Sequence, residues 1–288
     1  MNEIVSHTQY KGKDALKIEG LGNFCLSRTL DCGQCFRWEP ADRSLTEHIG
    51  IAHGRAILAV QKAPGELILP EVSEQEYTAI WRDYFSLGLD WAHIRSDIES
   101  RAEPLRRAAE TASGIHILSQ DPYEALVSFI ISQCNNIPRI KGLIRAICEH
   151  YGDRISTPDG SVAYTFPSAE RILSEPLSSL TALKLGYRDE YIYSACRAVC
   201  DGVIDTITEA KDTRDAERIL LGMQGIGKKV AACVLLFGFG RLDAFPVDIW
   251  MKRSLARHFP DCRDFSVFGE YAGVAQQYLF YSERYSQA

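Results

Sequence analysis

The stretch 220–257, near the end of the chain, constrains the fold more than any other part of the sequence. Gly225 and Gly227 flank a single isoleucine there and separate two patterns of helical spacing. Because glycine adopts a positive φ without steric cost, this Gly-Ile-Gly predicts a hairpin between two helices, over about 213–238. The second helix would begin near Lys228 with unpaired backbone N–H groups and a positive dipole end, which suit a phosphate.

Two residues of the same stretch have side chains suited to catalysis. Lys229 follows Gly227 by two positions, and Asp248 closes a Pro-Val-Asp triplet. A nucleophilic amine must be uncharged, and a helix N-terminus and desolvation both favour that form. An aspartate before a helix can cap it and also face a positively charged transition state. Alternatively, Lys228 and Lys229 form a solvated face that contacts phosphate, and Asp248 is only a cap.

Length and composition are those of a globular protein. The 288 residues, 46% hydrophobic and 24% charged, allow about two domains. Nine irregularly spaced cysteines and a charged N-terminus without a visible signal peptide favour an intracellular setting, either cytoplasm and nucleoid in a bacterium or a nucleus. The longest uncharged apolar run, 230–240, is too short to span a membrane.

The net charge of −6 argues mildly against a nucleic-acid partner, because DNA-binding domains usually carry a basic surplus. Binding requires only a local basic face, so acidic residues would then lie on the opposite face. The candidates for that face are Arg139, Lys141, Arg145, Lys184, Arg188, Lys228, Lys229, Lys252, Arg253 and Arg257.

The two parts of the chain differ in periodicity. Residues 1 to about 70 carry repeated turn signals and β-prone runs at 48–51, 56–60 and 67–69, which predict an antiparallel sheet. A Ser-x-x-Glu start at Ser73 predicts a helix, and another is expected within 90–113. Further helices are expected near 122–134, 136–151, 168–175, 177–184, 188–203, 213–222, 228–238, 248–258 and 266–283.

The predicted fold class is therefore α+β. An N-terminal antiparallel β-sheet domain with flanking helices, residues 1–115, would pack on a larger all-α domain, residues 116–288.

The stretch 220–257 resembles the helix-hairpin-helix and Gly-Pro-Asp motif of the base-excision DNA glycosylases. The 8-oxoguanine DNA glycosylase branch of that superfamily is similar along the whole chain. The resemblance rests on four separated blocks: Cys-Gly-Gln-Cys-Phe-Arg-Trp at 32–38, Ser-Phe-Ile-Ile-Ser-Gln-Cys-Asn-Asn-Ile-Pro-Arg-Ile at 128–140, Lys-Leu-Gly-Tyr-Arg at 184–188, and Val-Ala-Gln-Gln-Tyr-Leu-Phe at 274–280.

This resemblance implies a pocket for the damaged base. The carbonyl of Gly33 would accept a hydrogen bond from the N7–H of 8-oxoguanine, and such a site rejects guanine, which lacks this donor. Cys233 and Phe280 would sandwich the base. Gln276, which shares a helix face with Phe280, would read its Watson–Crick edge. Lys229 and Asp248 would be the catalytic nucleophile and its electrostatic partner.

The resemblance also implies contacts to the rest of the DNA. Arg139 and Arg188 would read the orphaned cytosine, Asn135 and Asn136 would occupy the gap, and Tyr187 would wedge into the stack. The phosphate contacts would come from Gly225, Gly227, Lys228 and Trp250. Three positions depart from the family pattern: Cys134 replaces an asparagine, Trp250 stands where histidine is frequent, and Glu283 where aspartate is usual.

The expected function is that of a bifunctional DNA glycosylase and lyase. It would excise 8-oxoguanine, preferably opposite cytosine, through a lysine Schiff base and then nick the strand by β-elimination. The partner would be double-stranded DNA with an oxidised purine. We expect a monomer with no membrane association, no metal in catalysis and no cofactor, although a structural cation could sit at the hairpin.

Three alternatives remain open from the residues alone. The chain could be a glycosylase of this fold for another damaged base, such as an alkylated one. It could be a helix-hairpin-helix protein that binds DNA without chemistry. The spacing of Cys32 and Cys35 also allows a thiol redox enzyme, although no second such pair accompanies it.

Overall fold

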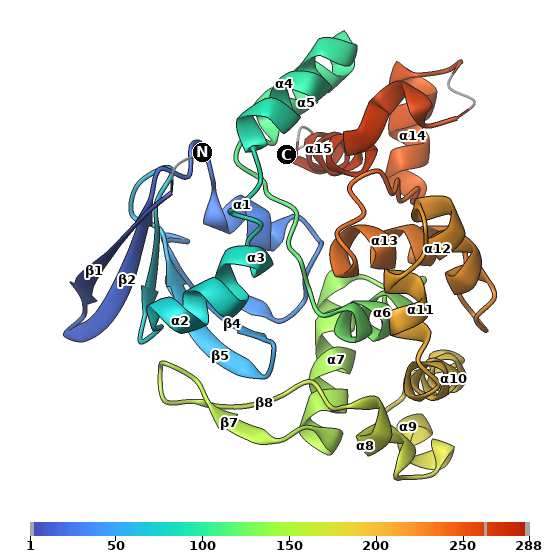
Figure 1. The fold of residues 1–288 in the computed structure, drawn as a ribbon. Coiled ribbons are helices and arrows are strands. Elements are labelled where there is room, and N and C mark those ends of the chain that lie inside the picture. Colours follow the sequence, from blue (N-terminus) through green and yellow to red (C-terminus); the bar gives the residue numbers. More distant parts are fainter. Residues whose placement is uncertain (1–2, 262–263, 286–288) are drawn as a thin grey trace.

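The N-terminal part of the protein is a six-stranded antiparallel sheet, as the turn signals predicted (Figure 1). The structure, a computed structural model, describes residues 3–261 and 264–285. The strand order is β1-β2-β6-β5-β4-β3. The strands are β1 (Ile4–Tyr10), β2 (Lys13–Glu19), β3 (Trp38–Pro40), β4 (Glu47–Ala52), β5 (Arg55–Val60) and β6 (Leu67–Pro70).

Tight turns set the register of this sheet. His53 and Gly54, at φ +48° and +72°, join β4 to β5 in a two-residue loop, so that Ala52 pairs with Arg55. Two positive φ angles give a turn whose twist matches that of the strands it connects. Burial alternates along β4, which shows that the sheet has one face on a core.

One short helix within the sheet region was not predicted. Helix α1 (Leu26–Asp31) lies between β2 and β3 and buries Leu26, Thr29 and Leu30. Six residues are too few for a helical period to stand out, and a helix of this length depends on tertiary packing. It leads directly into the 32–38 block.

The rest of the chain is helical. Ser73 caps α2 (Glu74–Glu76) by accepting a bond from the N–H of Glu76 at 3.1 Å, which confirms the predicted start. A π-helical turn (Tyr77–Trp81) and α3 (Arg82–Tyr84) follow. The later helices are α4 (Trp91–Arg101), α5 (Glu103–Thr111), α6 (Pro122–Ile131), α7 (Ile137–Tyr151), α8 (Ala169–Leu173), α9 (Leu177–Ala182), α10 (Arg188–Cys200), α11 (Val203–Thr208), α12 (Thr213–Leu221), α13 (Lys228–Gly238), α14 (Ile249–His258), a 3₁₀ helix (Ser266–Tyr271) and α15 (Ala272–Tyr285).

Two main hydrophobic cores correspond to the two parts. One core lies against the sheet, and the other fills the helical part. Helices α4 and α5 contribute their buried side chains to the helical core, where α5 packs on α15. The α+β architecture is thus confirmed, while the division at residues 115 and 116 stays a prediction.

The structure also differs from the sequence prediction elsewhere. The one helix expected within 90–113 is two helices, α4 and α5, separated by Ala102 in an extended conformation. The helix expected over 188–203 is α10, which ends at Cys200. A second helix that was not predicted, α11, begins at Val203 after Gly202, whose φ is +87°. A small hairpin of β7 (Arg154–Ser156) and β8 (Val162–Tyr164) lies in a segment for which no element was predicted. Three-residue strands carry too little alternation to be recognised in a sequence.

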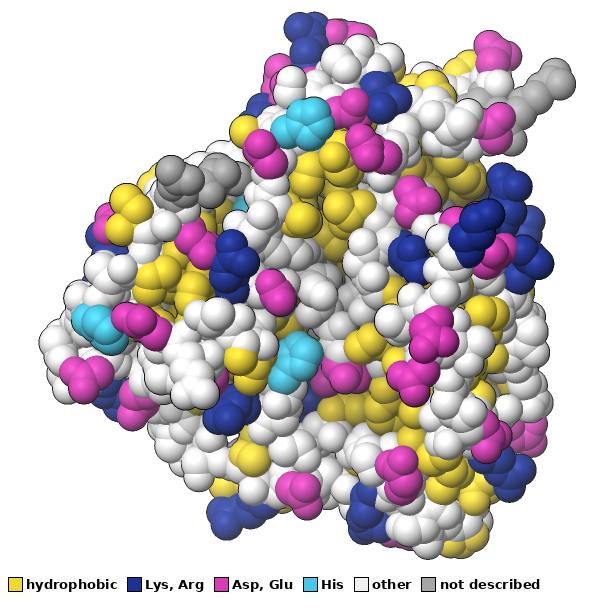
Figure 2. Space-filling view, in the orientation of Figure 1, with side chains coloured by type: hydrophobic (Ala, Val, Ile, Leu, Met, Phe, Trp, Pro, Cys, Tyr) yellow, Lys and Arg dark blue, Asp and Glu magenta, His cyan; other side chains and the backbone are white. Residues whose placement is uncertain are grey.

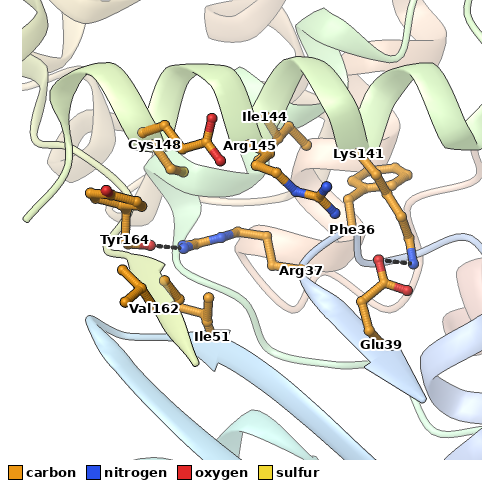
Figure 3. A pocket seen from close by; sticks show the side chains of 12 residues that line it. Phe36, Arg37, Glu39, Ile51, Lys141, Ile144, Arg145, Cys148, Val162 and Tyr164 are labelled. Atoms are coloured by element: carbon orange, nitrogen blue, oxygen red, sulfur yellow. Dashed lines mark hydrogen bonds and ion pairs between the residues drawn. The ribbon is translucent and has the colours of Figure 1, made fainter. Parts of the chain in front are cut away.

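A pocket of about 590 Å³ lies where the sheet meets α7 and the β7–β8 hairpin (Figure 3). Arg37 reaches across it to donate to the carbonyl of Tyr164, and Lys141 pairs with Glu39 at 3.1 Å. Phe36 also lines this pocket. None of the predicted catalytic or base-binding residues lines this pocket. Its lining comes from both parts of the protein, so it lies at their junction.

Charged side chains of both signs are interspersed on the face shown in Figure 2, with Lys and Arg side chains gathered on the side of α12 and α14. Two of the ten candidate basic residues are paired with acids, Lys141 with Glu39 and Arg257 with Glu283. Lys228 is exposed. In the described part of the chain, no helix has both the length and the apolar character needed to cross a membrane.

Candidate active site

The predicted hairpin joins α12 to α13. Gly225 has a φ of +77°, and a Cβ placed there would lie 2.3 Å from the ring of Tyr191. Only glycine fits this position. Gly227 is the N-cap of α13, and no heavy atom of the described residues lies within 4 Å of a Cβ built on it. Ile226 is buried between the two glycines, so the backbone of the turn faces outward.

Lys229 lies in the first turn of α13 and points toward α6 rather than into bulk water. Its Nζ donates a hydrogen bond to the Oγ of Ser132 at 3.1 Å and lies 5.2 Å from the centre of the Phe129 ring. The side chain is partly buried. These contacts hold the amine in one direction, which a nucleophile requires.

Asp248 is the N-cap of α14, as its position before that helix predicted. Its Oδ1 accepts a hydrogen bond from the N–H of Met251 at 2.8 Å. The carboxyl also lines the pocket that contains Lys229. One residue therefore caps a helix and lines the pocket that contains the amine.

The predicted base-binding residues converge on that same pocket, which encloses about 350 Å³ up to its open mouth. Its lining comes from the 32–33 turn, from α6, α13 and α15, and from the segment before α14. The lining residues are Cys32, Gly33, Phe129, Lys229, Cys233, Phe237, Pro246, Asp248, Gln276, Gln277 and Phe280.

Burial affects two polar groups in the pocket, the thiol of Cys233 and the side-chain carbonyl of Gln276. Burial raises the pKa of the Cys233 thiol, while nearby Lys229 lowers it and Asp248 raises it. The side chain of Gln276 is only 4% exposed, and its Oε1 has no hydrogen-bond partner among the described residues. A buried carbonyl oxygen without a donor costs free energy, and a bound base with an N–H group would satisfy it.

Gly33 occupies the pocket wall with a φ of +83°. A Cβ there would lie 3.7 Å from Phe280, so the positive φ, more than space, requires glycine. The next residue, Gln34, is fully buried and donates to the carbonyls of Thr29 and His116, each at 2.8 Å. These bonds fix the turn against the segment that precedes α6.

Sequence reasoning missed three residues around Lys229 and Gly33. They are Ser132 and Phe129, which contact the Lys229 amine, and Gln277, whose Nε2 donates to the carbonyl of Cys32 at 2.7 Å. Ser132 and Phe129 lie inside the 128–140 block, but nothing in the sequence shows that this block meets α13. Gln277 was overlooked because the family resemblance gave a role to its neighbour Gln276 and none to Gln277.

The residues expected to contact the opposite strand lie in the loop before α7, in the first turn of α7 and at the start of α10. Tyr187 is 50% exposed. Partial burial, and to a smaller extent the nearby Cys134 thiol, raise the pKa of its hydroxyl. Arg139 is exposed, and Asn136 caps α7 by accepting from the N–H of Arg139 at 3.0 Å. Asn135 donates to the carbonyl of Ile131 at 2.9 Å. The roles of these residues at a cytosine stay predictions.

Arg188 binds backbone carbonyls of the protein itself. It is buried, and its guanidinium donates to the carbonyls of Leu185 at 3.1 Å and Gln133 at 3.0 Å. The side chain therefore ties the 184–188 turn to the loop after α6. In this structure it holds the two loops together, and the cytosine contact that the resemblance implies for it stays a prediction.

Two of the departures from the family pattern, Trp250 and Glu283, have contacts with or within α14. Trp250 is partly buried, with the guanidinium of Arg253 5.3 Å from its ring centre. Glu283 is buried and bonds Arg257 at 3.2 Å and His258 at 3.3 Å. Glu283 thus pairs with the end of α14 rather than with Trp250. The phosphate contact of Trp250 stays a prediction.

The Cys32 and Cys35 thiols do not have the character of a redox pair. Both are buried and free, and burial raises the pKa of Cys32 to about 12 and that of Cys35 well above its usual value. A reactive thiol needs a lowered pKa and exposure. Within residues 3–261 and 264–285, no group of three or more His, Cys, Asp or Glu side chains is arranged to hold a metal ion.

Comparison with known proteins matches both parts of the chain to one kind of enzyme. The family model for the 8-oxoguanine DNA glycosylase N-terminal domain matches residues 18–126. The model for HhH-GPD superfamily base excision DNA repair proteins matches residues 127–264.

Similar structures and sequences agree with these matches. The 8-oxoguanine glycosylase/lyase of Clostridium acetobutylicum, solved with double-stranded DNA containing cytosine opposite 8-oxoG, is 31% identical with a TM-score of 0.90 over 99% of both chains. MBOgg1, solved with a low affinity DNA ligand, is 33% identical with a TM-score of 0.90 over 100% of both chains. The N-glycosylase/DNA lyase of Saccharomyces cerevisiae is 28% identical over 257 residues, 82% of this chain and 68% of the yeast protein.

Identity above 30% over the full length, an equivalent fold, and a pocket in which Lys229, Asp248, Gly33 and Gln276 meet lead to the same assignment. The chain belongs to the 8-oxoguanine DNA glycosylase family of helix-hairpin-helix base excision DNA repair enzymes.

Proposed function

We propose that this protein excises 8-oxoguanine from double-stranded DNA by means of the Lys229 amine and then cleaves the strand. The observation that carries the proposal is the convergence of Lys229, Asp248, Gly33 and Gln276 on one pocket from four separate segments. The hairpin would hold the backbone, and the damaged nucleotide would rotate out of the duplex into the pocket, at an unstacking cost of a few kcal/mol.

The first chemical step is displacement of the base. The uncharged amine of Lys229 attacks C1′ as the C1′–N9 bond breaks, and the bonding electrons leave with the base. A proton lost from the amine balances the charge on the departing base. The carboxylate of Asp248, on the same pocket wall, stabilises the positive charge that develops on the sugar. Capping of α14 keeps this carboxylate in place.

The second step is strand cleavage. Opening of the sugar ring converts the C1′–N bond to an iminium, which is the Schiff base, and the ring oxygen takes up a proton. Loss of a proton from C2′ then expels the 3′ phosphate by breaking the C3′–O bond. Water hydrolyses the remaining imine and regenerates Lys229. These steps use only groups of the protein, the DNA and water.

A preference for cytosine in the opposite strand is part of the proposal. Arg139 is exposed beside the loop 133–136, and Tyr187 protrudes from the adjoining turn. Arginine donors match the O2 and N3 acceptors of cytosine, and an aromatic ring offsets part of the stacking that is lost when a nucleotide rotates out. Because Arg188 is buried, we assign the base contact to Arg139 first.

The partner of the protein is then double-stranded DNA carrying an oxidised purine, and the protein would act as a monomer wherever the genome lies inside the cell. A cation held by backbone carbonyls of the hairpin is compatible with this mechanism but has no part in its chemistry.

Borohydride trapping tests the proposal. The protein is mixed with duplexes carrying 8-oxoguanine opposite each of the four bases, and borohydride reduces any Schiff base to a stable covalent link. We expect a covalent product that forms fastest opposite cytosine. Lys229→Gln should bind the same duplex without trapping or excision. Excision by that variant would contradict the nucleophile assignment.

The same assay separates the alternatives. Duplexes with an alkylated purine form a second arm, and preferential trapping there would indicate a glycosylase for another lesion. Binding without excision of any damaged base would indicate a non-catalytic DNA-binding protein.

A further inference from the structure

One hydrogen bond joins the two halves of the protein at the wall of the base pocket. The Nε2 of Gln277, on α15, donates to the carbonyl of Cys32, in the turn after α1, at 2.7 Å. Gln277 is 3% exposed and lines the same pocket as Gly33. Burial raises the pKa of the Cys32 thiol, and the nearby Gln277 side chain partly offsets this effect.

Other glutamines hold the turn on its far side. The Nε2 of Gln120 donates to the backbone carbonyl of Gln34 at 2.7 Å. The side chain of Gln34 accepts from the N–H of Leu118 at 2.9 Å. The Gly33 carbonyl therefore belongs to a peptide that is held on both sides. Before it, Gln277 holds the carbonyl of Cys32. After it, both the side chain and the backbone carbonyl of Gln34 are hydrogen-bonded.

Gly33 itself cannot supply this rigidity. A glycine at φ +83° has no Cβ to restrict rotation, and it reaches negative φ almost as readily. Both neighbouring peptides must be fixed from outside for the Gly33 carbonyl to keep one direction. On the upstream side, the bond from Gln277 to Cys32 does so.

We propose that Gln277 is a positioning residue that sets the discrimination of the enzyme against undamaged guanine. The inference rests on the proposed function, in which the Gly33 carbonyl meets the N7–H of 8-oxoguanine. With guanine in the pocket, that carbonyl faces the lone pair of N7, and two acceptors repel each other. This repulsion rejects guanine only if the carbonyl cannot turn away, so a fixed peptide gives specificity that a mobile one loses.

The experiment measures affinity in the Lys229→Gln background, where no excision disturbs the equilibrium. Dissociation constants are determined for three duplexes with cytosine opposite 8-oxoguanine, guanine or a stable abasic analogue. Gln277→Met keeps the length of the side chain and removes its donor. We expect the affinity ratio of 8-oxoguanine to guanine to fall about fivefold, with unchanged affinity for the abasic duplex.

Tyr278→Phe is the matched control, because Tyr278 is buried at the next position of α15 and does not line the pocket. It should leave the ratio unchanged. Gln277→Glu, of nearly identical shape, is the second variant in case methionine prevents folding, and both are checked for a single thermal transition. An unchanged ratio, or an equal loss for all three duplexes, would overturn the inference.

Failure of the proposed function gives a different result. If Lys229→Gln with native Gln277 has no preference for 8-oxoguanine over guanine, the substrate assignment is wrong and the inference falls with it. If that preference exists and survives in Gln277→Met, only the role of Gln277 is wrong.

Discussion

The Nζ of Lys229 donates to the Oγ of Ser132 at 3.1 Å, and that hydroxyl in turn donates to the carbonyl of Phe129 at 2.8 Å. Ser132 is the C-cap of α6 and the first residue of the loop that leads to Asn136. Lys229 is thus held by the same segment whose next residues we propose to face the opposite strand. A serine hydroxyl with one donor and two lone pairs can accept from the amine while its proton is used elsewhere.

Replacing Ser132 by alanine should slow base excision about three- to tenfold, because the amine loses a hydrogen bond that limits its orientation. DNA affinity should change little. Single-turnover rates and the yield of borohydride trapping measure the effect. Ser128→Ala, a buried serine one turn earlier on α6, is the control. Equal rates for the Ser132 variant and wild type would show that the hydroxyl does not position Lys229.

The two roles of Asp248 can be separated by substitution. Asp248→Asn keeps an oxygen that can cap α14 but removes the charge, so excision should fall about 10²-fold while the melting temperature stays nearly constant. Asp248→Ala also loses the bond to Met251, which should cost about 1 kcal/mol of stability. Rates and thermal melts of both variants test this. A slow and equally destabilised Asn variant would contradict it.

Because the Oε1 of Gln276 has no hydrogen-bond partner among the described residues, we expect a substitution there to raise stability and lower activity. Gln276→Met removes a buried acceptor without a donor, so the free protein should melt about 2–4 °C higher. Excision of 8-oxoguanine should drop at least about tenfold, because the base edge loses its partner. Leu279→Met, on the same helix, is the control for a change of packing alone. A lower melting temperature for Gln276→Met would contradict the prediction that the unpartnered oxygen destabilises the free protein.

Acid sensitivity should depend on His116. Burial lowers the pKa of His116 from 6.5 to about 3, and its ring stacks on Trp91 at 4.1 Å. Between these pH values the unfolded chain binds a proton that the native state does not, so stability is full above pH 6.5 and falls as the pH drops toward 3. The slope from this group should approach about 1.4 kcal/mol per pH unit.

Urea unfolding between pH 7 and pH 4 measures this dependence. His116→Gln cannot titrate, and its stability should decline less steeply over that range. Parallel curves for the two proteins would exclude His116 as the source of the acid sensitivity.

Much of the local structure follows from the sequence because it depends on residues a few positions apart. Ser73, Asp121 and Asp248 each accept the N–H three residues later and begin a helix, as their types predict. Gly225 has the positive φ that its hairpin requires. Turn signals and β-prone runs predicted an antiparallel sheet, and helical spacing predicted the helices after it, which is the observed order.

The resemblance of separated blocks predicted which residues matter, and the structure brings six of them to one pocket. Neither α1 nor the β7–β8 hairpin was predicted. Such short elements have no clear sequence period and depend on packing against the rest of the protein. The roles of the residues expected to touch DNA remain predictions.

What only the tertiary structure decided is the partner of each side chain. Gln277 and Cys32 are 245 residues apart, and Ser132 and Lys229 are 97 apart, so no local spacing could pair them. In this structure Arg188 donates to the carbonyls of Leu185 and Gln133, a pairing that its position in the sequence could not predict. Local conformation is set by neighbouring residues along the chain, whereas contacts across a site are set by how the helices and the sheet pack.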